Sequence, residues 1–144
     1  LEGLSRLGIR AIISHPERHP VLARSGLSEC QARSVLLRWL AQPAHIQVTC
    51  ASLLGDFGAM AQQAAWHFLA SGWACLVATD AHDLDGRRPR MRAAYHHIRA
   101  RLGEATARRV CIENPLRVLE GEQVVSTQDT VTRTWIDARY PTIS

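Results

Sequence analysis

Short apolar runs alternate with longer amphipathic stretches along most of this chain. Three runs of five or six residues are rich in apolar and branched side chains, a length and composition typical of buried strands. They lie at 9–14 (IRAIIS), 45–49 (HIQVT) and 74–79 (ACLVAT). Helical patterns lie between and after them, and this alternation is typical of parallel βαβ units. The pattern therefore predicts an α/β fold.

The helical patterns carry recognisable start and stop signals. Ser28 and Gln31 have the spacing of a capping box, and Gly72 is placed as a C-terminal cap. Near the end of the pattern, Asn114 is predicted to cap a short helix that has Pro115 in its first turn. Helices are predicted over 28–43, 59–72, 90–103, 104–112 and 113–121, and a loop over 50–58.

From position 123 onward the chain is polar, rich in threonine and without a helical period. We therefore predict a domain over 1–122 and a polar C-terminal extension, loosely packed, over 123–144. Three strands cannot close a barrel, and a barrel domain usually needs about 250 residues. We expect the region 1–122 to be the later part of a larger unit.

The composition limits the classes of protein to which this chain can belong. The chain is 47% hydrophobic and 21% charged, which is typical of a globular protein. No apolar stretch approaches the roughly 20 residues of a membrane span, and the first residues are not organised as a signal peptide. We expect a cytoplasmic protein without membrane insertion, and a homo-oligomer is compatible with the sequence.

Charge and cysteine content exclude further classes. All 17 basic residues are arginine, but no aromatic residues are interleaved with them as stacking platforms, so nucleic-acid binding is not expected. The four cysteines form no CxxC pair, which argues against a zinc ribbon or a dithiol redox centre. Cys50 and Cys75 lie in or beside apolar runs, and we expect them to be buried, reduced and inert.

Polar residues that could bind metal follow two of the predicted strands. His15 comes directly after the first strand in SHPER, and Asp80 and His82 follow the third in TDAH. In an extended strand end, Asp80 and His82 would project to the same side. The carboxyl ends of parallel strands meet at one edge of a sheet, so the two motifs are expected to share that edge. Imidazole and carboxylate ligands together suit manganese, iron or zinc.

Arginines accompany both motifs. Arg18 lies three residues after His15, and Arg87 and Arg88 follow TDAH in a glycine-containing loop. A guanidinium group offers a planar fork of donors to phosphate, and metal ions beside arginines are what phosphate-ester hydrolysis requires. The next arginine, Arg90, is predicted to lie on the solvated face of the following helix.

The segment GDFG at 55–58 matches the DFG triplet of protein kinases. A kinase also needs a strand lysine, and this chain contains no lysine, so the kinase interpretation fails. A turn that begins a helix, with Asp56 near its positive end, is the expected structure. The turn could also line the mouth of a pocket.

Four segments together resemble the later half of the CpsB/CapC-type bacterial protein-tyrosine phosphatases of the PHP (polymerase and histidinol phosphatase) superfamily. These segments are AIISHPERH, IQVTCASLLGDFG, VATDAHDLDGRRPRM and ENPLRVLEG. The resemblance implies a distorted TIM-like (β/α)7 barrel, of which this chain covers the later βα units. It also implies a cluster of divalent metal ions, often Mn²⁺, at the carboxyl ends of the strands.

The resemblance also assigns roles to individual residues. His15, Asp80 and His82 would be metal ligands, and Arg18 and Arg87 would be the catalytic residues that hold the phosphate of phosphotyrosine. The implied substrate is an autophosphorylated tyrosine kinase that controls capsule and exopolysaccharide synthesis. The resemblance thus implies a metal-dependent protein-tyrosine phosphatase.

One feature of the family is missing, since no HxH motif occurs in these 144 residues. About half of the implied metal ligands are therefore absent, and we expect the chain to be a fragment with little activity alone. Two alternatives stay open. One is another PHP phosphoesterase acting on a small phosphate ester such as histidinol phosphate, and the other is a non-catalytic regulatory remnant.

Overall fold

The structure is a computed structural model that describes residues 1–20, 22, 34, 38–39, 41 and 44–126. In chain order its elements are α1 (Glu2–Arg6), β1 (Ala11–Ser14), the 3-10 helix η1 (Pro16–Arg18), β2 (Ala44–Thr49), α4 (Cys50–Leu54), α5 (Gly58–Ala70), β3 (Ala74–Ala78), α6 (Met91–Leu102), α7 (Glu104–Arg108), the π-helix η2 (Arg109–Glu113) and α8 (Asn114–Leu119). The helix predicted over 28–43 falls mostly outside the described residues.

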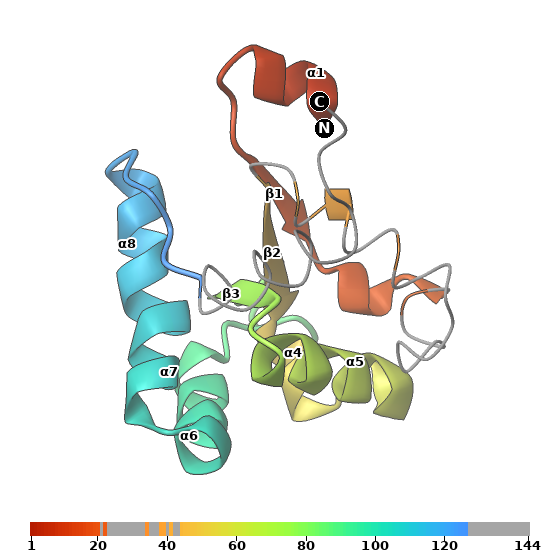
Figure 1. Cartoon of the computed structure of the whole chain (residues 1–144). Coiled ribbons are helices and arrows are strands. Elements are labelled where there is room, and N and C mark those ends of the chain that lie inside the picture. The colour runs from red at the N-terminus through yellow and green to blue at the C-terminus, as the bar shows by residue number, and fades with distance from the viewer. Residues whose placement is uncertain (21, 23–33, 35–37, 40, 42–43, 127–144) are drawn as a thin grey trace.

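The α/β class is confirmed by a parallel sheet with strand order β1-β2-β3 (Figure 1). The strands coincide with the three predicted apolar runs, although β1 begins two residues later than predicted. Because all three are parallel, their carboxyl ends at Ser14, Thr49 and Ala78 lie along the same edge of the sheet. The segments that follow these three residues are therefore brought together in space.

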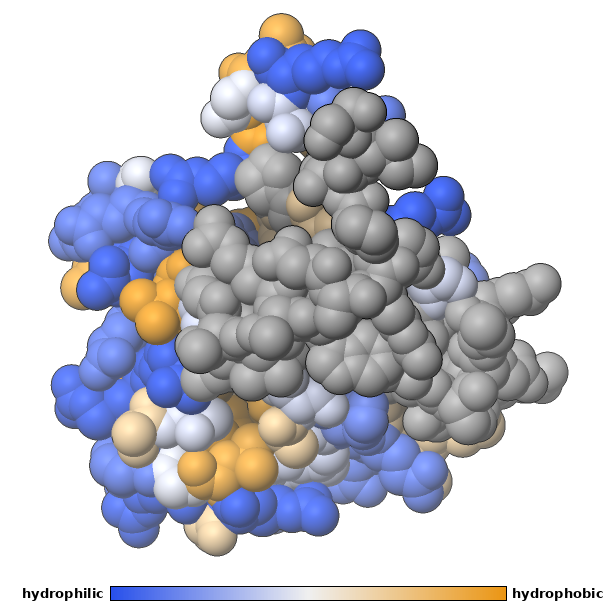
Figure 2. All heavy atoms as spheres, viewed as in Figure 1, coloured by the Kyte–Doolittle hydropathy of each residue, from blue (hydrophilic) through white to orange (hydrophobic). Residues whose placement is uncertain are grey.

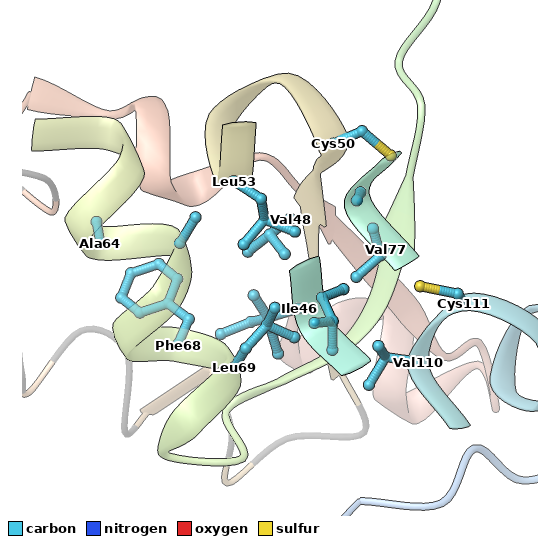
Figure 3. Packing of buried hydrophobic residues seen from close by; sticks show 14 of the residues in the cluster. Ile46, Val48, Cys50, Leu53, Ala64, Phe68, Leu69, Val77, Val110 and Cys111 are labelled. Atoms are coloured by element: carbon cyan, nitrogen blue, oxygen red, sulfur yellow. The ribbon is translucent and has the colours of Figure 1, made fainter. Parts of the chain in front are cut away.

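The main hydrophobic core lies between the sheet and its helices (Figure 3). Ile46 and Val48 of β2 are fully buried, and the ring of Phe68 from α5 packs beside them. Val110 and Cys111 of η2 extend the cluster beyond β3. Burial of a large aromatic ring at the centre of such a cluster stabilises the fold by roughly 2 to 3 kcal/mol.

The cysteines behave as predicted in the described residues. Cys50, Cys75 and Cys111 are all buried. Burial raises the pKa of the Cys50 thiol to about 11 and that of the Cys111 thiol to about 12. A thiol held in its neutral form is a poor nucleophile, so the expectation that Cys50 is inert agrees with its surroundings.

Residues 50–58 were predicted to form a loop, and this prediction is wrong for the first five of them. They form α4, because Thr49 at the end of β2 acts as a helix N-cap whose side chain accepts a hydrogen bond from the backbone N–H of Ser52. Gly55, with a φ of 94°, ends the helix in the left-handed conformation that glycine tolerates best. A turn then leads into α5 at Gly58, as predicted.

Asn114 does not cap a helix, contrary to prediction. Its backbone is helical, and η2 runs into α8 without a break. The buried side chain instead donates to the carbonyl oxygens of Cys75 at 2.8 Å and Val125 at 2.9 Å, and accepts from the Val125 N–H. Val124 is buried against β3, so the start of the predicted extension is attached to the sheet rather than lying loose. The rest of the predicted extension lies outside the described residues.

The surface is largely hydrophilic, with hydrophobic patches that include the end of the molecule at α1 (Figure 2). There Leu4 is 40% exposed and Leu7 is 74% exposed. In the part of the chain that the structure describes, no helix combines the length and apolar character needed to cross a membrane.

Candidate functional site

The first segment that forms the candidate site is the turn that follows β1. His15 has a φ of 42°, a left-handed conformation that is uncommon outside glycine. Its N–H donates to the carbonyl of Gln47, so the strand pairing extends into the turn. Pro16 then begins η1, and the Arg18 N–H donates to the His15 carbonyl at 3.1 Å. This tight turn aims the Arg18 side chain along the edge of the sheet.

Glu17 anchors this turn to the neighbouring strand. Its side chain is fully buried, and Oε1 accepts hydrogen bonds from the backbone N–H and the hydroxyl of Thr49 at 3.1 and 3.2 Å. The Thr49 hydroxyl also lies 2.8 Å from that of Ser52, so one buried network joins η1 to the start of α4. The second oxygen, Oε2, is buried without a hydrogen-bond partner in the part of the chain that is described.

The second segment of the candidate site is the loop that follows β3. Asp80 has a φ of 51°, so the backbone there is not extended, and the predicted strand-like alternation of Asp80 and His82 does not apply. His82 is exposed, and its Nδ1 lies 2.9 Å from the Asp80 carbonyl oxygen. The loop closes on itself through a hydrogen bond from the His82 N–H to the Arg87 carbonyl.

The Asp83 carboxylate stabilises this loop by hydrogen bonds to its backbone. Its Oδ1 accepts hydrogen bonds from the backbone N–H groups of Asp85, Gly86 and Arg87 at 2.9, 2.6 and 2.8 Å. The hydrogen bond from the Arg87 N–H is the largest influence on the carboxyl group, and with the other two it holds the pKa of Asp83 below its usual value. An ionised Asp83 therefore fixes the backbone that carries Arg87.

The turn after β1 and the loop after β3 come into contact at the Asp80 carboxylate. Arg18 Nη1 donates to Asp80 Oδ2 at 2.7 Å, and Arg87 Nη2 donates to the same oxygen. Partial burial alone would raise the pKa of Asp80, but the hydrogen bond from Arg18 and the charges of Arg87 and Arg18 outweigh it, so the pKa lies below its ordinary value of 3.8. One Asp80 oxygen is shared by two guanidinium groups, so each group keeps N–H donors that this contact does not use.

The GDFG turn is the third segment of the candidate site. The Arg18 guanidinium lies over the ring of Phe57, with its Cζ atom 4.2 Å from the ring centroid. One residue earlier, both Asp56 oxygens accept from Arg90 Nη1, at 2.9 and 2.7 Å. Arg90 was predicted to lie on the solvated face of the next helix; its side chain is 39% exposed, but it is paired with Asp56, which was not predicted. Arg90 precedes α6 and ties the loop after β3 to this turn.

The structure thus brings three of the five predicted site residues into direct contact, namely Arg18, Asp80 and Arg87. The predicted metal ligands do not gather in the same way. Among the described residues, no group of three or more His, Cys, Asp or Glu side chains is placed to hold a metal ion. His15 and His82 have the right chemistry, but their roles as ligands stay predictions.

Several residues that build the site were not found from the sequence. Asp83 could have been recognised, because Asp-x-x-Gly is a typical turn signal in which the carboxylate accepts from backbone N–H groups. Glu17 carries no local signal, since its partner Thr49 lies 32 residues away. Phe57 belongs to the GDFG turn, which was considered as the mouth of a pocket, but its contact with Arg18 in another loop was not predicted.

The fold is shared with known metal-dependent phosphatases. A chain from the crystal structures of YwqE from Bacillus subtilis and CpsB from Streptococcus pneumoniae, named there as unique metal-dependent tyrosine phosphatases, superposes with a TM-score of 0.75 at 22% sequence identity. The superposition covers 86% of this chain and 47% of the solved one. At this level of identity the likeness concerns the fold alone.

A relative is also found by sequence. This chain is 28% identical over 120 residues to the tyrosine-protein phosphatase CpsB of Streptococcus pneumoniae. The match covers 83% of this chain and 48% of the relative, so the chain spans about half the length of the curated relative that it matches. The family model for capsular polysaccharide synthesis, CpsB/CapC, matches residues 1–120. This chain is therefore a member of the CpsB/CapC family.

Proposed function

We propose that this chain forms the arginine-lined side of the active site of a metal-dependent protein-tyrosine phosphatase. The observation that carries the proposal is the convergence of Arg18 and Arg87 on one oxygen of Asp80. The two arginines come from different loops, 69 positions apart in the sequence, at the edge of a parallel sheet where ligands usually bind. Membership of the CpsB/CapC family and the named activity of its CpsB relative support the same function.

In this proposal Arg18 and Arg87 bind and orient the phosphate of the substrate. Each guanidinium has five N–H donors in a fixed plane, and the bond to Asp80 uses one of them. The remaining N–H groups can donate charge-assisted hydrogen bonds to the oxygens of a phosphate dianion. As negative charge develops on the phosphoryl oxygens during hydrolysis, the same donors stabilise it.

The residues described here do not form a metal centre by themselves. The imidazoles of His15 and His82 and the carboxylate of Asp80 suit Mn²⁺, Fe or Zn by donor type. They are not assembled into one group within the described part of the chain, and Asp80 is already paired with two arginines. We propose that these three residues supply part of a metal site and that other ligands complete it.

The finer identity of the whole protein follows from the family and is part of the proposal. We infer that the sheet is the later part of a distorted (β/α)7 barrel. The substrate would be phosphotyrosine on an autophosphorylating tyrosine kinase that controls capsule and exopolysaccharide synthesis, and the place of action would be the cytoplasm. A phosphotyrosine carried on a kinase is a dianion, which suits the remaining guanidinium N–H donors of Arg18 and Arg87.

Binding of phosphate esters to single-site variants tests the proposal. The affinity of the 144-residue chain for inorganic phosphate and for phosphotyrosine would be measured by calorimetry, with and without manganese(II) chloride. We expect Arg18→Ala and Arg87→Ala each to weaken binding about tenfold or more, since each removes charge-assisted hydrogen bonds.

Arg88 offers a matched control, because it is adjacent to Arg87 and exposed. Arg88→Ala removes the same charge one position further along and should change the affinity by no more than about twofold. If Arg88→Ala weakens binding as much as Arg87→Ala, the effect is one of overall charge, and the proposed phosphate site is wrong. Absence of any phosphate binding by the unmodified chain would also refute it.

A further inference from the structure

Phe57 is an aromatic ring held at the surface beside the arginines of the proposed phosphate site. Its residue is 37% exposed, and the ring lies under the Arg18 guanidinium at 4.2 Å from Cζ to the ring centroid. The backbone at Phe57, with φ −99° and ψ 17°, lies in the sparsely populated region in which many active-site residues are found. The ring is thus neither part of the buried core nor remote from the site.

The turn that carries Phe57 is fixed on both sides. Gly55 and Gly58 have φ values of 94° and 85°, conformations that side chains rarely adopt. Between them, Asp56 donates its N–H to the Ala51 carbonyl and accepts two hydrogen bonds from Arg90. These contacts tie the turn to α4 and to the loop after β3, so the ring is presented in a set position relative to Arg18.

We propose that Phe57 is a specificity-determining residue that favours aryl phosphate esters over alkyl phosphate esters. This inference rests on the proposed function, because it assumes that Arg18 binds the phosphate. A phosphate held by the in-plane donors of Arg18 lies at the edge of the guanidinium, whose face is covered by Phe57. The carbon group attached to that phosphate then lies within reach of Phe57, and a planar aromatic group can pack against the ring at the usual centroid separation of about 4.5–7 Å.

A phosphoserine or small alkyl phosphate gains little from the same ring, because it carries no aromatic face. The site would therefore distinguish two esters with identical phosphate groups through one side chain. Phe57 also orients Arg18 by the cation–π contact, and loss of that contact should weaken all phosphate ligands alike. Only contact with the substrate ring changes the ratio of the aryl and alkyl affinities.

The test is the ratio of the affinities for phosphotyrosine and phosphoserine, measured by calorimetry on the 144-residue chain, with inorganic phosphate as a third ligand. For the unmodified chain we expect a preference for phosphotyrosine of about three- to tenfold, the range of one aromatic pair. Phe57→Leu, which keeps an apolar side chain but removes the ring, should bring the ratio to about one. Phe57→Tyr, which retains the ring, should restore the preference.

The outcomes separate the two proposals. If the unmodified chain binds inorganic phosphate through Arg18 but shows equal affinity for the two esters, or if Phe57→Leu keeps the full preference, the role of Phe57 is refuted while the phosphate site stands. If the unmodified chain binds none of the three ligands, both proposals fail. Urea denaturation of Phe57→Leu checks that the variant is folded as the parent is.

Discussion

Removing the Glu17 side chain should destabilise the protein strongly, because this buried side chain joins η1 to the end of β2. Glu17 is fully buried, and its Oε1 accepts from both the N–H and the hydroxyl of Thr49. In Glu17→Ala both donors lose their acceptor. An unsatisfied buried N–H costs about 1 to 3 kcal/mol, and the lost hydroxyl bond adds about 1 kcal/mol.

An opposing contribution reduces this total. Oε2 has no hydrogen-bond partner among the described residues, and a buried carboxylate oxygen without one is unfavourable. Truncation relieves that cost, so we expect a net loss of about 2 to 3 kcal/mol in the free energy of unfolding. Glu17→Gln keeps the volume and the accepting oxygen but places an amide NH2 group where Oε2 has no partner in the described part of the chain, so it should lose about 1 to 2 kcal/mol, less than Glu17→Ala.

Equilibrium urea unfolding of these two variants and of Thr49→Val measures the difference. Thr49→Val removes the hydroxyl but keeps the N–H donor. A double-mutant cycle between Glu17→Ala and Thr49→Val should give a coupling energy of about 1 kcal/mol. The reasoning is refuted if Glu17→Ala unfolds at the same urea concentration as Glu17→Gln, because the hydrogen bonds to Thr49 would then contribute nothing.

Three further predictions concern charge, thiols and the packing of residue 114. Because the folded pKa of Asp80 lies below 3.8, its ion pairs stabilise the protein above that pH and are lost as the pH falls through the folded pKa. Asp80→Asn should therefore be less stable than the parent by about 1 kcal/mol at pH 7, and the two urea curves should converge in acid; a constant difference would contradict this. In a Cys30→Ser background the native chain should react very slowly with a thiol reagent at pH 8, and three thiols should appear on denaturation, since the described cysteines are buried. Asn114→Ala should lower the free energy of unfolding by about 2 to 4 kcal/mol in urea titrations, because it leaves a strand carbonyl and the Val125 backbone groups without their partner; a loss below about 0.5 kcal/mol would exclude this role.

Local composition was sufficient to predict most of the elements. The three apolar runs are strands, and the alanine-rich stretch before Gly72 is a helix, because chain periodicity and short-range sterics act within a few residues. The loop predicted over 50–58 failed for a reason that is also local. Thr49 caps α4 with its side chain, and a threonine at the end of a strand was not recognised as a helix start.

Asn114 and Arg90 illustrate interactions that local patterns do not contain. Asn114 has the residue type and the following proline of a helix cap, yet its side chain bonds the backbone of β3, 39 residues earlier. The sequence pattern places Arg90 on a helix surface, yet its side chain binds Asp56, 34 residues away. In both cases the partner is brought near only by the fold. For the buried Asn114, the side chain takes the backbone partners that satisfy its polar atoms.

The amino-acid sequence by itself determined that His15, Arg18, Asp80, His82 and Arg87 follow strands of a parallel sheet, and hence that they share one edge. Only the tertiary structure decided which of them touch. The left-handed backbone at His15 and Asp80, the anchoring of Glu17 on Thr49 and the bonds of Asp83 place Arg18 and Arg87 on the same carboxylate oxygen. The physical reason is that the positions of strands along the chain follow from short-range patterns, whereas the direction of each side chain depends on backbone angles set by hydrogen bonds between distant segments.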